Sequence, residues 1–147
     1  MKILLLDIDY TLFDGDTPRP HVKEFLEEMN SKYDIHFYTA ATRVRVAEVL
    51  RILKFTLGLS QDIITKLDRG ALTRENCPMI ELKNGATVKS LDKASEVLEK
   101  PVEDMILFDD NPSYDNPHVN QVVQAEGFMK DMEDDDYLIR IIKGGIL

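Results

Sequence analysis

The chain has 147 residues, a length that suits one domain with a single sizeable core. Its hydrophobic share of 44% and charged share of 31% are typical of a folded, soluble protein and exclude a disordered chain. The formal net charge of −9 disfavours a nucleic-acid partner, because neutralising nucleic-acid phosphates requires clustered Lys and Arg.

The sequence also carries little sign of export or membrane insertion. No apolar run reaches the roughly 18 residues that span a bilayer, and the N-terminus lacks the pattern of a signal peptide. We therefore expect no membrane partner and no secretion, and a protein of the cytoplasm, or of the nucleus if the source is eukaryotic. The single cysteine, Cys77, excludes an internal disulfide framework and fits a reducing compartment. Because free cysteine usually packs in the core, we interpret Cys77 as a packing residue.

Strand and helix patterns alternate in the first third of the chain. Nearly continuous apolar sequence over 2–8 predicts a strand buried on both faces. A helix is predicted from Pro20 to Lys32, where apolar residues recur on one face. A second strand is predicted over 34–39, and helical spacing returns over 43–54.

The middle of the chain loses this helical periodicity. Ile63-Ile64 and two later apolar runs have the character of short strands, and Asn84-Gly85 between the later runs predicts a hairpin. We therefore expect a small β-rich insert over about residues 61–88.

Regular alternation resumes in the last third. A helix is predicted over 91–99, buried strands over 104–110 and 121–124, and a final helix over 133–143. The acidic run 131–136 is interpreted as favouring the positive end of that helix, not as a second metal site. Together the elements predict one α/β domain over residues 1–147, with a parallel sheet between two layers of helices.

Polar groups able to do chemistry follow three of the predicted strands. The first strand ends in Asp7 and Asp9, the second in Thr39, and the third in Asp109 and Asp110. The carboxyl ends of parallel strands meet at one edge of a sheet, so these groups should converge there. Converging carboxylates repel one another and need a cation, and oxygen ligands of this kind suit Mg²⁺.

The spacing of Asp7 and Asp9, and the presence of the other polar groups, favour a catalytic role over a purely structural one. One Asp after a strand is commonly a turn or cap residue, but two such sites together with Thr39 are a rarer combination. Residues two apart in extended chain face the same way, so Asp7 and Asp9 can address one substrate. One carboxylate can attack phosphorus while the other handles the proton of the leaving group.

Three segments resemble motifs I, II and IV of the haloacid-dehalogenase (HAD) superfamily. The sequence DIDYT at Asp7 resembles motif I, Thr39 in HFYTAATR resembles motif II, and FDDNP at Asp109 resembles motif IV. Within this superfamily, the sequence most resembles the FCP/SCP-type phosphatases, which act on the C-terminal domain of RNA polymerase II. The segments that carry it are residues 18–50, LTRENC (72–77), VKSLDK (88–93) and DDNPSY (109–114) followed by Asn120.

The resemblance implies a role for each motif I and motif IV residue. Asp7 would be the nucleophile and a metal ligand. Asp9 would be the general acid/base and would bind the metal through its main-chain carbonyl. Asp110 would complete the Mg²⁺ site, with Asp109 beside it as a supporting carboxylate. Thr11 would brace the motif I loop at the edge of the substrate site.

The resemblance also implies the groups that meet the phosphoryl oxygens. Thr39 would donate a hydrogen bond to one of them, beside Ala40. A lysine would neutralise their charge, and the candidates by position are Lys83, Lys89 and Lys93. Lys89 matches the family motif and precedes the predicted helix, so we expect it to fill this role.

These expectations describe a Mg²⁺-dependent phosphomonoester hydrolase that works through an aspartyl-phosphate. The segment 12–19 is too short for a folded cap domain, so the site should be open and suit a phosphoserine or phosphothreonine protein or peptide. One alternative is a capless HAD phosphatase acting on phosphotyrosine, a phosphosugar or another small ester. Another is a catalytically silent binding module on the same fold.

Overall fold

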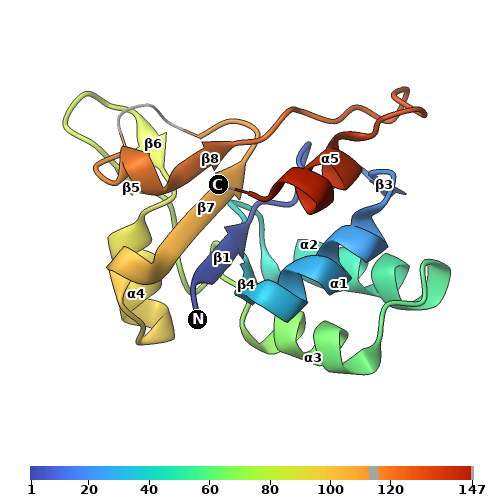
Figure 1. The fold of residues 1–147 in the computed structure, drawn as a ribbon. Coiled ribbons are helices and arrows are strands. Elements are labelled where there is room, and N and C mark those ends of the chain that lie inside the picture. The colour runs from blue at the N-terminus through green and yellow to red at the C-terminus, as the bar shows by residue number, and fades with distance from the viewer. Residues whose placement is uncertain (113–115, 147) are drawn as a thin grey trace.

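A four-stranded parallel sheet forms the centre of the molecule, with the strand order β4-β1-β7-β8 (Figure 1). The computed structural model describes residues 1–112 and 116–146. The strands are β1 (Ile3–Leu6), β4 (Asp34–Phe37), β7 (Met105–Asp109) and β8 (Val122–Gln124). All three strand pairs are parallel, which confirms the predicted parallel sheet and its four strands.

Helices and short hairpins complete the fold. The helices are α1 (Val22–Lys32), α2 (Arg43–Arg51) with a π-helical continuation (Ile52–Thr56), α3 (Gln61–Arg69), α4 (Leu91–Leu98) and α5 (Tyr137–Gly144). Two 3₁₀ turns cover Val102–Asp104 and Val119–Gln121. Two antiparallel hairpins pair β2 (Phe13–Asp14) with β3 (Thr17–Pro18) and β5 (Ile80–Glu81) with β6 (Thr87–Val88).

Helices cover both faces of the sheet, and this explains why its strands are apolar on both sides. Leu4 and Leu6 of β1 face a core that they share with α1, α2, α3 and α5. Ile3 and Leu5 face the opposite way, into a core shared with α4. Figure 1 shows α4 on one side of the sheet and α1 on the other. The predicted three-layer arrangement is therefore confirmed.

The middle of the chain is only partly β-structured, so the expected β-rich insert is wrong in its first third. Residues 61–69 form α3, in which Ile63, Ile64 and Leu67 are buried on one face. Their i, i+1, i+4 spacing is helical, but it spans too few residues to be separated from a short strand by sequence alone. The hairpin at Asn84-Gly85 is confirmed, with Leu82 N–H donating to the Ala86 carbonyl and Gly85 in the left-handed region.

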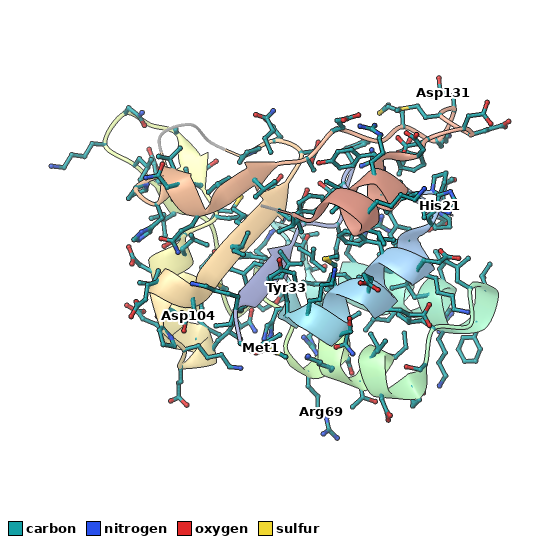
Figure 2. All side chains as sticks on the ribbon, in the orientation of Figure 1. Met1, His21, Tyr33, Arg69, Asp104 and Asp131 are labelled. Carbon is teal, nitrogen blue, oxygen red and sulfur yellow. The ribbon has the colours of Figure 1, made fainter. Side chains whose placement is uncertain are left out.

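The final helix begins at Tyr137, four residues later than predicted. The reason is Arg19, which is fully buried and binds both carboxylate oxygens of Asp135 at 2.9 and 3.0 Å. Asp135 Oδ1 also accepts the Tyr137 N–H at 3.2 Å, so only this member of the acidic run caps the first helical amide. Asp131 projects into solvent, near the tip of the loop before α5 (Figure 2).

Arg19 ties this C-terminal segment to the loop after β1. Its Nη1 donates to the carbonyls of Thr11 at 3.0 Å and Glu126 at 2.6 Å. Its guanidinium lies 4.7 Å from the centre of the Tyr137 ring. Every polar end of this buried cation is therefore satisfied, as burial requires. In the described ranges 1–112 and 116–146, no helix has both the length and the apolarity to cross a membrane.

Candidate active site

Three carboxylates meet where β1 and β7 end side by side. Asp7 follows β1, Asp109 ends β7, and Asp110 comes next in the chain. Asp7 and Asp109 are buried, at 6% and 5% exposure, and Asp110 is half-buried. The three residues each offer a carboxylate oxygen, and these oxygens lie within 4.8 Å of one another. Of the five residues predicted to converge at the strand ends, Asp7, Asp109 and Asp110 therefore form one cluster, and Asp9 and Thr39 lie outside it.

Lys89 supplies a cation between two of these carboxylates. Its Nζ lies 2.6 Å from Asp7 Oδ1 and 2.7 Å from Asp109 Oδ2, and the side chain is 8% exposed. The other two candidate lysines lie elsewhere. Lys83 is exposed in the hairpin, and Lys93 is half-exposed and pairs with Glu96 at 3.7 Å.

The local backbone explains how Lys89 reaches the sheet edge. Ser90 caps α4 by accepting the Lys93 N–H at 3.0 Å, so the helix starts only after Lys89. The Lys89 carbonyl accepts from Asn116 Nδ2 at 3.2 Å, and the Ser90 carbonyl accepts from the buried Tyr38 hydroxyl at 3.0 Å. These bonds fix the residue between a helix start and the sheet.

The charges of this cluster do not cancel. Burial raises the pKa of Asp7 well above its usual range, although the nearby ammonium of Lys89 opposes the rise. Burial alone would lower the pKa of Lys89, but the carboxylates of Asp7 and Asp109 outweigh it and raise that pKa. With Asp110 the cluster holds three carboxylates and one ammonium, which leaves two net negative charges when all are ionised.

Thr11 lies behind the carboxylates and braces them. It is fully buried, and its hydroxyl lies 2.8 Å from Asp7 Oδ2 and 3.0 Å from Asp110 Oδ1. One hydroxyl has one proton, so it donates to one of these oxygens at a time. Thr11 Oγ1 also accepts a hydrogen bond from the Asp110 N–H at 3.0 Å, and this bond joins the loop after β1 to the end of β7.

Asp9 lies apart from the cluster and has a different partner. Its side chain is 43% exposed, and its Oδ1 lies 3.0 Å from Arg45 Nε and 2.9 Å from Arg45 Nη2. Arg45 belongs to the first turn of α2 and also donates to the Gly15 carbonyl at 2.7 Å. The Asp9 carboxylate therefore reaches the site from its rim, while Asp7 forms part of its floor.

Thr39 and Ala40 follow β4 on the other side of β1. Thr39 is buried, its N–H donates to the Leu72 carbonyl at 2.9 Å, and its Oγ1 accepts the Ala41 N–H at 3.0 Å. Because the hydroxyl oxygen is used as an acceptor, its own proton is left to donate. Ala40 is exposed and lines the cavity described next.

A cavity of about 260 Å³ opens above the carboxylates. Asp7, Asp9, Lys89, Asp109 and Asp110 line its polar part. The rest of the wall is formed by Tyr10, Ala40, Met79, Thr87, Val88, Leu107, Asn111, Pro112 and Asn116. A buried carboxylate, a buried cation and a partly exposed carboxylate thus line one cavity.

Comparison with known proteins identifies the family. The sequence model of the NLI interacting factor-like phosphatases matches residues 2–144, which is almost the whole chain. The chain belongs to the NLI interacting factor-like phosphatase family. This membership confirms the predicted resemblance to the FCP/SCP-type enzymes.

Named relatives of this phosphatase-family chain are longer proteins. Ubiquitin-like domain-containing CTD phosphatase 1 of Drosophila melanogaster is 33% identical over 85 residues, covering 52% of this chain and 27% of that protein. The protein of the same name from Homo sapiens is 29% identical over 120 residues, covering 74% of this chain and 36% of that protein. The chain thus spans about a third of the length of these relatives.

Two solved structures share the fold of this family member. The RNA polymerase II CTD phosphatase Fcp1 superposes with a TM-score of 0.58 at 16% identity, covering 87% of this chain and 42% of that one. A fission yeast Fcp1-R271A structure bound to beryllium fluoride gives a TM-score of 0.57 at 14% identity, covering 86% and 42%. At this identity the likeness concerns the fold, and it confirms the predicted HAD-like α/β class.

Several residues of this family member's site were not expected from the sequence. Arg45 and Asn116 contact Asp9 and Lys89, respectively, across long sequence separations. One signal for Arg45 was present, because a cation in the first turn of a helix opposes the helix dipole and suggests a compensating anion. Ser113 and Tyr114 of the motif DDNPSY lie outside the described residues.

The donor set fits a divalent metal ion. All three clustered side chains are carboxylates, and their two net negative charges match one divalent cation. The Asp9 carboxylate is not part of this cluster, and metal binding through the Asp9 main-chain carbonyl stays a prediction. Cys77 is buried, and burial raises the pKa of its thiol, which disfavours a nucleophilic role.

Proposed function

We propose that residues 1–147 form a phosphatase domain that hydrolyses phosphomonoesters through a covalent phosphate on Asp7. One observation carries the proposal. The Asp7 carboxylate lies in the floor of the cavity with a buried ammonium 2.6 Å from Oδ1 and a buried hydroxyl 2.8 Å from Oδ2. A carboxylate fixed in this way is held in one orientation and is balanced by a positive charge that also attracts phosphate.

The reaction runs in two displacement steps. An oxygen of Asp7 attacks phosphorus, the bond to the leaving oxygen breaks, and Asp9 gives that oxygen a proton. Water then attacks the phosphorus of the aspartyl-phosphate while Asp9 takes a proton from it, which releases phosphate and restores Asp7. The separation between a buried Asp7 and a 43% exposed Asp9 suits these roles, since the acid/base must reach both leaving group and water.

The remaining polar groups balance the charge of the phosphoryl oxygens. Lys89 lines the cavity and places its ammonium beside the attacking carboxylate. Thr39 offers its hydroxyl proton beside the exposed Ala40. Asp109 keeps Lys89 in place, with its own Oδ1 accepting the Asn111 N–H at 2.9 Å.

Mg²⁺ is the proposed cofactor. Asp7, Asp110 and the main-chain carbonyl of Asp9 would hold it. When bound, a divalent cation supplies positive charge that stabilises the phosphoryl oxygens. Thr11 supports this site by joining the carboxylates of Asp7 and Asp110 through one hydroxyl.

A phosphoserine or phosphothreonine protein is the proposed substrate. Thr87 and Val88 of β6, together with Met79 just before β5, form a wall of the cavity. A hairpin of this size leaves room for a polypeptide to enter from the side, in contrast to a folded cap that encloses a small molecule. The named relatives are CTD phosphatases, which supports a phosphorylated protein as the substrate class. The buried free thiol of Cys77 supports a reducing compartment, the cytoplasm or the nucleus.

Steady-state hydrolysis of a substrate panel tests the proposal. The panel holds phosphoserine, phosphothreonine and phosphotyrosine peptides and a set of phosphosugars, each assayed with Mg²⁺ and with EDTA. We expect the highest kcat/KM for phosphoserine or phosphothreonine peptides, loss of turnover in EDTA, and inhibition by beryllium fluoride, which mimics a phosphoryl group on a carboxylate. Asp7→Asn should reduce turnover to background, because an amide is not a nucleophile.

Three outcomes would refute specific parts of this proposal. Near-normal activity of Asp7→Asn would refute the covalent mechanism through Asp7. A clear preference for a phosphosugar would refute the proposal that the substrate is a protein. A shortened β5–β6 hairpin that leaves peptide selectivity unchanged would refute it as well.

A further inference from the structure

The guanidinium of Arg45 holds the Asp9 carboxylate from α2. Nε and Nη2 lie 3.0 and 2.9 Å from the same oxygen, Asp9 Oδ1. Nη2 also donates to the Gly15 carbonyl at 2.7 Å, in the turn that joins β2 to β3. Arg45 therefore joins three parts of the chain: the loop after β1, the β2–β3 hairpin and the start of α2.

The position of Arg45 is unfavourable for a cation without a partner. The first turn of α2 contains no acidic residue, and the positive end of the helix dipole repels a guanidinium there. The side chain is only 14% exposed, so most of its hydration is lost as well. The ion pair with Asp9 offsets both costs. It also holds the long side chain of Arg45 in one conformation.

The contact with Arg45 also makes the two carboxylate oxygens of Asp9 different from one another. Both Arg45 nitrogens bind Oδ1, and within residues 1–112 and 116–146 no hydrogen bond involves Oδ2. Asp9 lines the cavity. The geometry leaves Oδ2 as the oxygen for proton transfer and Oδ1 as the oxygen for anchoring.

We propose that Arg45 is a positioning residue that fixes the Asp9 carboxylate for proton transfer, an inference that rests on the proposed phosphatase function. In the first step the bond from phosphorus to the leaving oxygen breaks and the proton on Asp9 Oδ2 passes to that oxygen. Without Arg45 the partly exposed carboxylate rotates freely and spends little time in the productive orientation. A misplacement of about 1 Å can cost about 10²-fold in rate.

The leaving group separates this role from a purely structural one. A serine alkoxide is a poor leaving group and needs the proton, whereas 2,4-dinitrophenolate leaves readily without it. The value of kcat/KM covers the steps up to the departure of this group. Loss of a positioning residue for the acid must therefore lower kcat/KM for a phosphoserine peptide far more than for 2,4-dinitrophenyl phosphate.

The test compares Arg45→Ala with Arg45→Lys, Asp9→Asn and the double variant on these two substrates, in the presence of Mg²⁺. Arg43→Ala is the matched control, because Arg43 is an exposed residue of the same helix turn and pairs with Asp68. We expect Arg45→Ala to lower kcat/KM about 10–100-fold for the phosphoserine peptide and less than about 3-fold for the dinitrophenyl ester. Arg45→Lys should recover part of the loss, and Arg43→Ala should stay within about 2-fold of the wild type.

The double variant supplies an independent readout. If Arg45 acts through Asp9, adding Arg45→Ala to Asp9→Asn should lower the rate no further. Equal losses on both substrates, or additive losses in the double variant, would overturn the inference while leaving the phosphatase function intact. A wild type inactive on both substrates would overturn the proposed function, and this inference with it. If Arg45→Ala melts below the assay temperature, Arg45→Met, which keeps the side-chain stem, takes its place.

Discussion

Replacing Lys89 by methionine tests the charge arrangement of the site most directly. The substitution keeps an unbranched apolar stem but removes the ammonium that lies 2.6 Å from Asp7 and 2.7 Å from Asp109. Both carboxylates are buried, so they would lose their cation without gaining water. Burial already raises the pKa of Asp7, and without the opposing ammonium of Lys89 that pKa should rise further, which disfavours the ionised carboxylate that the proposed mechanism needs.

Two magnitudes follow from this geometry. Breaking a buried ion pair by removing one partner typically costs about 3–5 kcal/mol of stability. For a chain of 147 residues this corresponds to a fall in Tm of roughly 6–20 °C. Removing a charge-stabilising donor from an active site typically lowers kcat by about 10²–10³-fold. Mg²⁺ should reduce the loss in Tm, because a divalent cation supplies part of the missing positive charge.

Thermal melting and peptide hydrolysis should therefore be measured with Mg²⁺ and with EDTA. Lys83→Met and Lys93→Met are the controls, since Lys83 is exposed and Lys93 makes only a 3.7 Å pair on a half-exposed surface. Exposed pairs of this kind contribute at most about 1 kcal/mol, so both controls should stay close to the wild type. Similar small effects for all three variants would refute the assignment of Lys89.

The other predictions concern metal binding, packing and pH. A hundredfold excess of Mg²⁺ over Kd should raise the free energy of unfolding by about 3 kcal/mol and the Tm with it, and Asp110→Asn should lose most of that rise in a thermal melt. Arg19→Ala should lower the free energy of urea unfolding by about 3–5 kcal/mol, because Asp135 and two carbonyls lose a buried partner. Asp34 lies in a partly buried position that would raise its pKa, but contacts with Lys100 and His36 lower that pKa from 3.8 to about 2. Its stabilising contribution, about 1–2 kcal/mol, should be complete above pH 4 and lost as the pH falls toward 2, and in Asp34→Asn this part of the pH dependence should be absent.

The parts of the fold that could be predicted are those with a strong local signal. The first strand is apolar at every position and ends in a carboxylate, and both features follow from its place in the middle of a covered parallel sheet. The same holds for the strand that ends at Asp109. Because parallel strands present their carboxyl ends at one edge, the meeting of Asp7 with Asp109 and Asp110 followed without any knowledge of contacts.

The parts that could not be predicted depend on distant contacts. The start of α5 at Tyr137 is set by Arg19, which lies 116 residues before its partner Asp135. The helix over 61–69 is stabilised by burial of Ile63, Ile64 and Leu67, and not by a long periodic pattern. The contact of Arg45 with Asp9 likewise joins residues 36 positions apart. In each case a tertiary contact decided between local alternatives that the sequence left nearly equal.

The two aspartates of the first motif show how one residue type can occupy two different environments. Asp7 and Asp9 are two positions apart, yet Asp7 directly follows a buried strand and is itself buried, while Asp9 lies on the rim. Lys89, which is 8% exposed and precedes α4, contacts the buried Asp7, whereas Arg45 contacts the partly exposed Asp9 from α2. Differences in burial and in partner can separate a nucleophile from an acid/base among chemically identical groups, which supports the roles proposed for Asp7 and Asp9. Exchanging the two cations would therefore not conserve function, since each holds its own carboxylate at a different depth of the cavity.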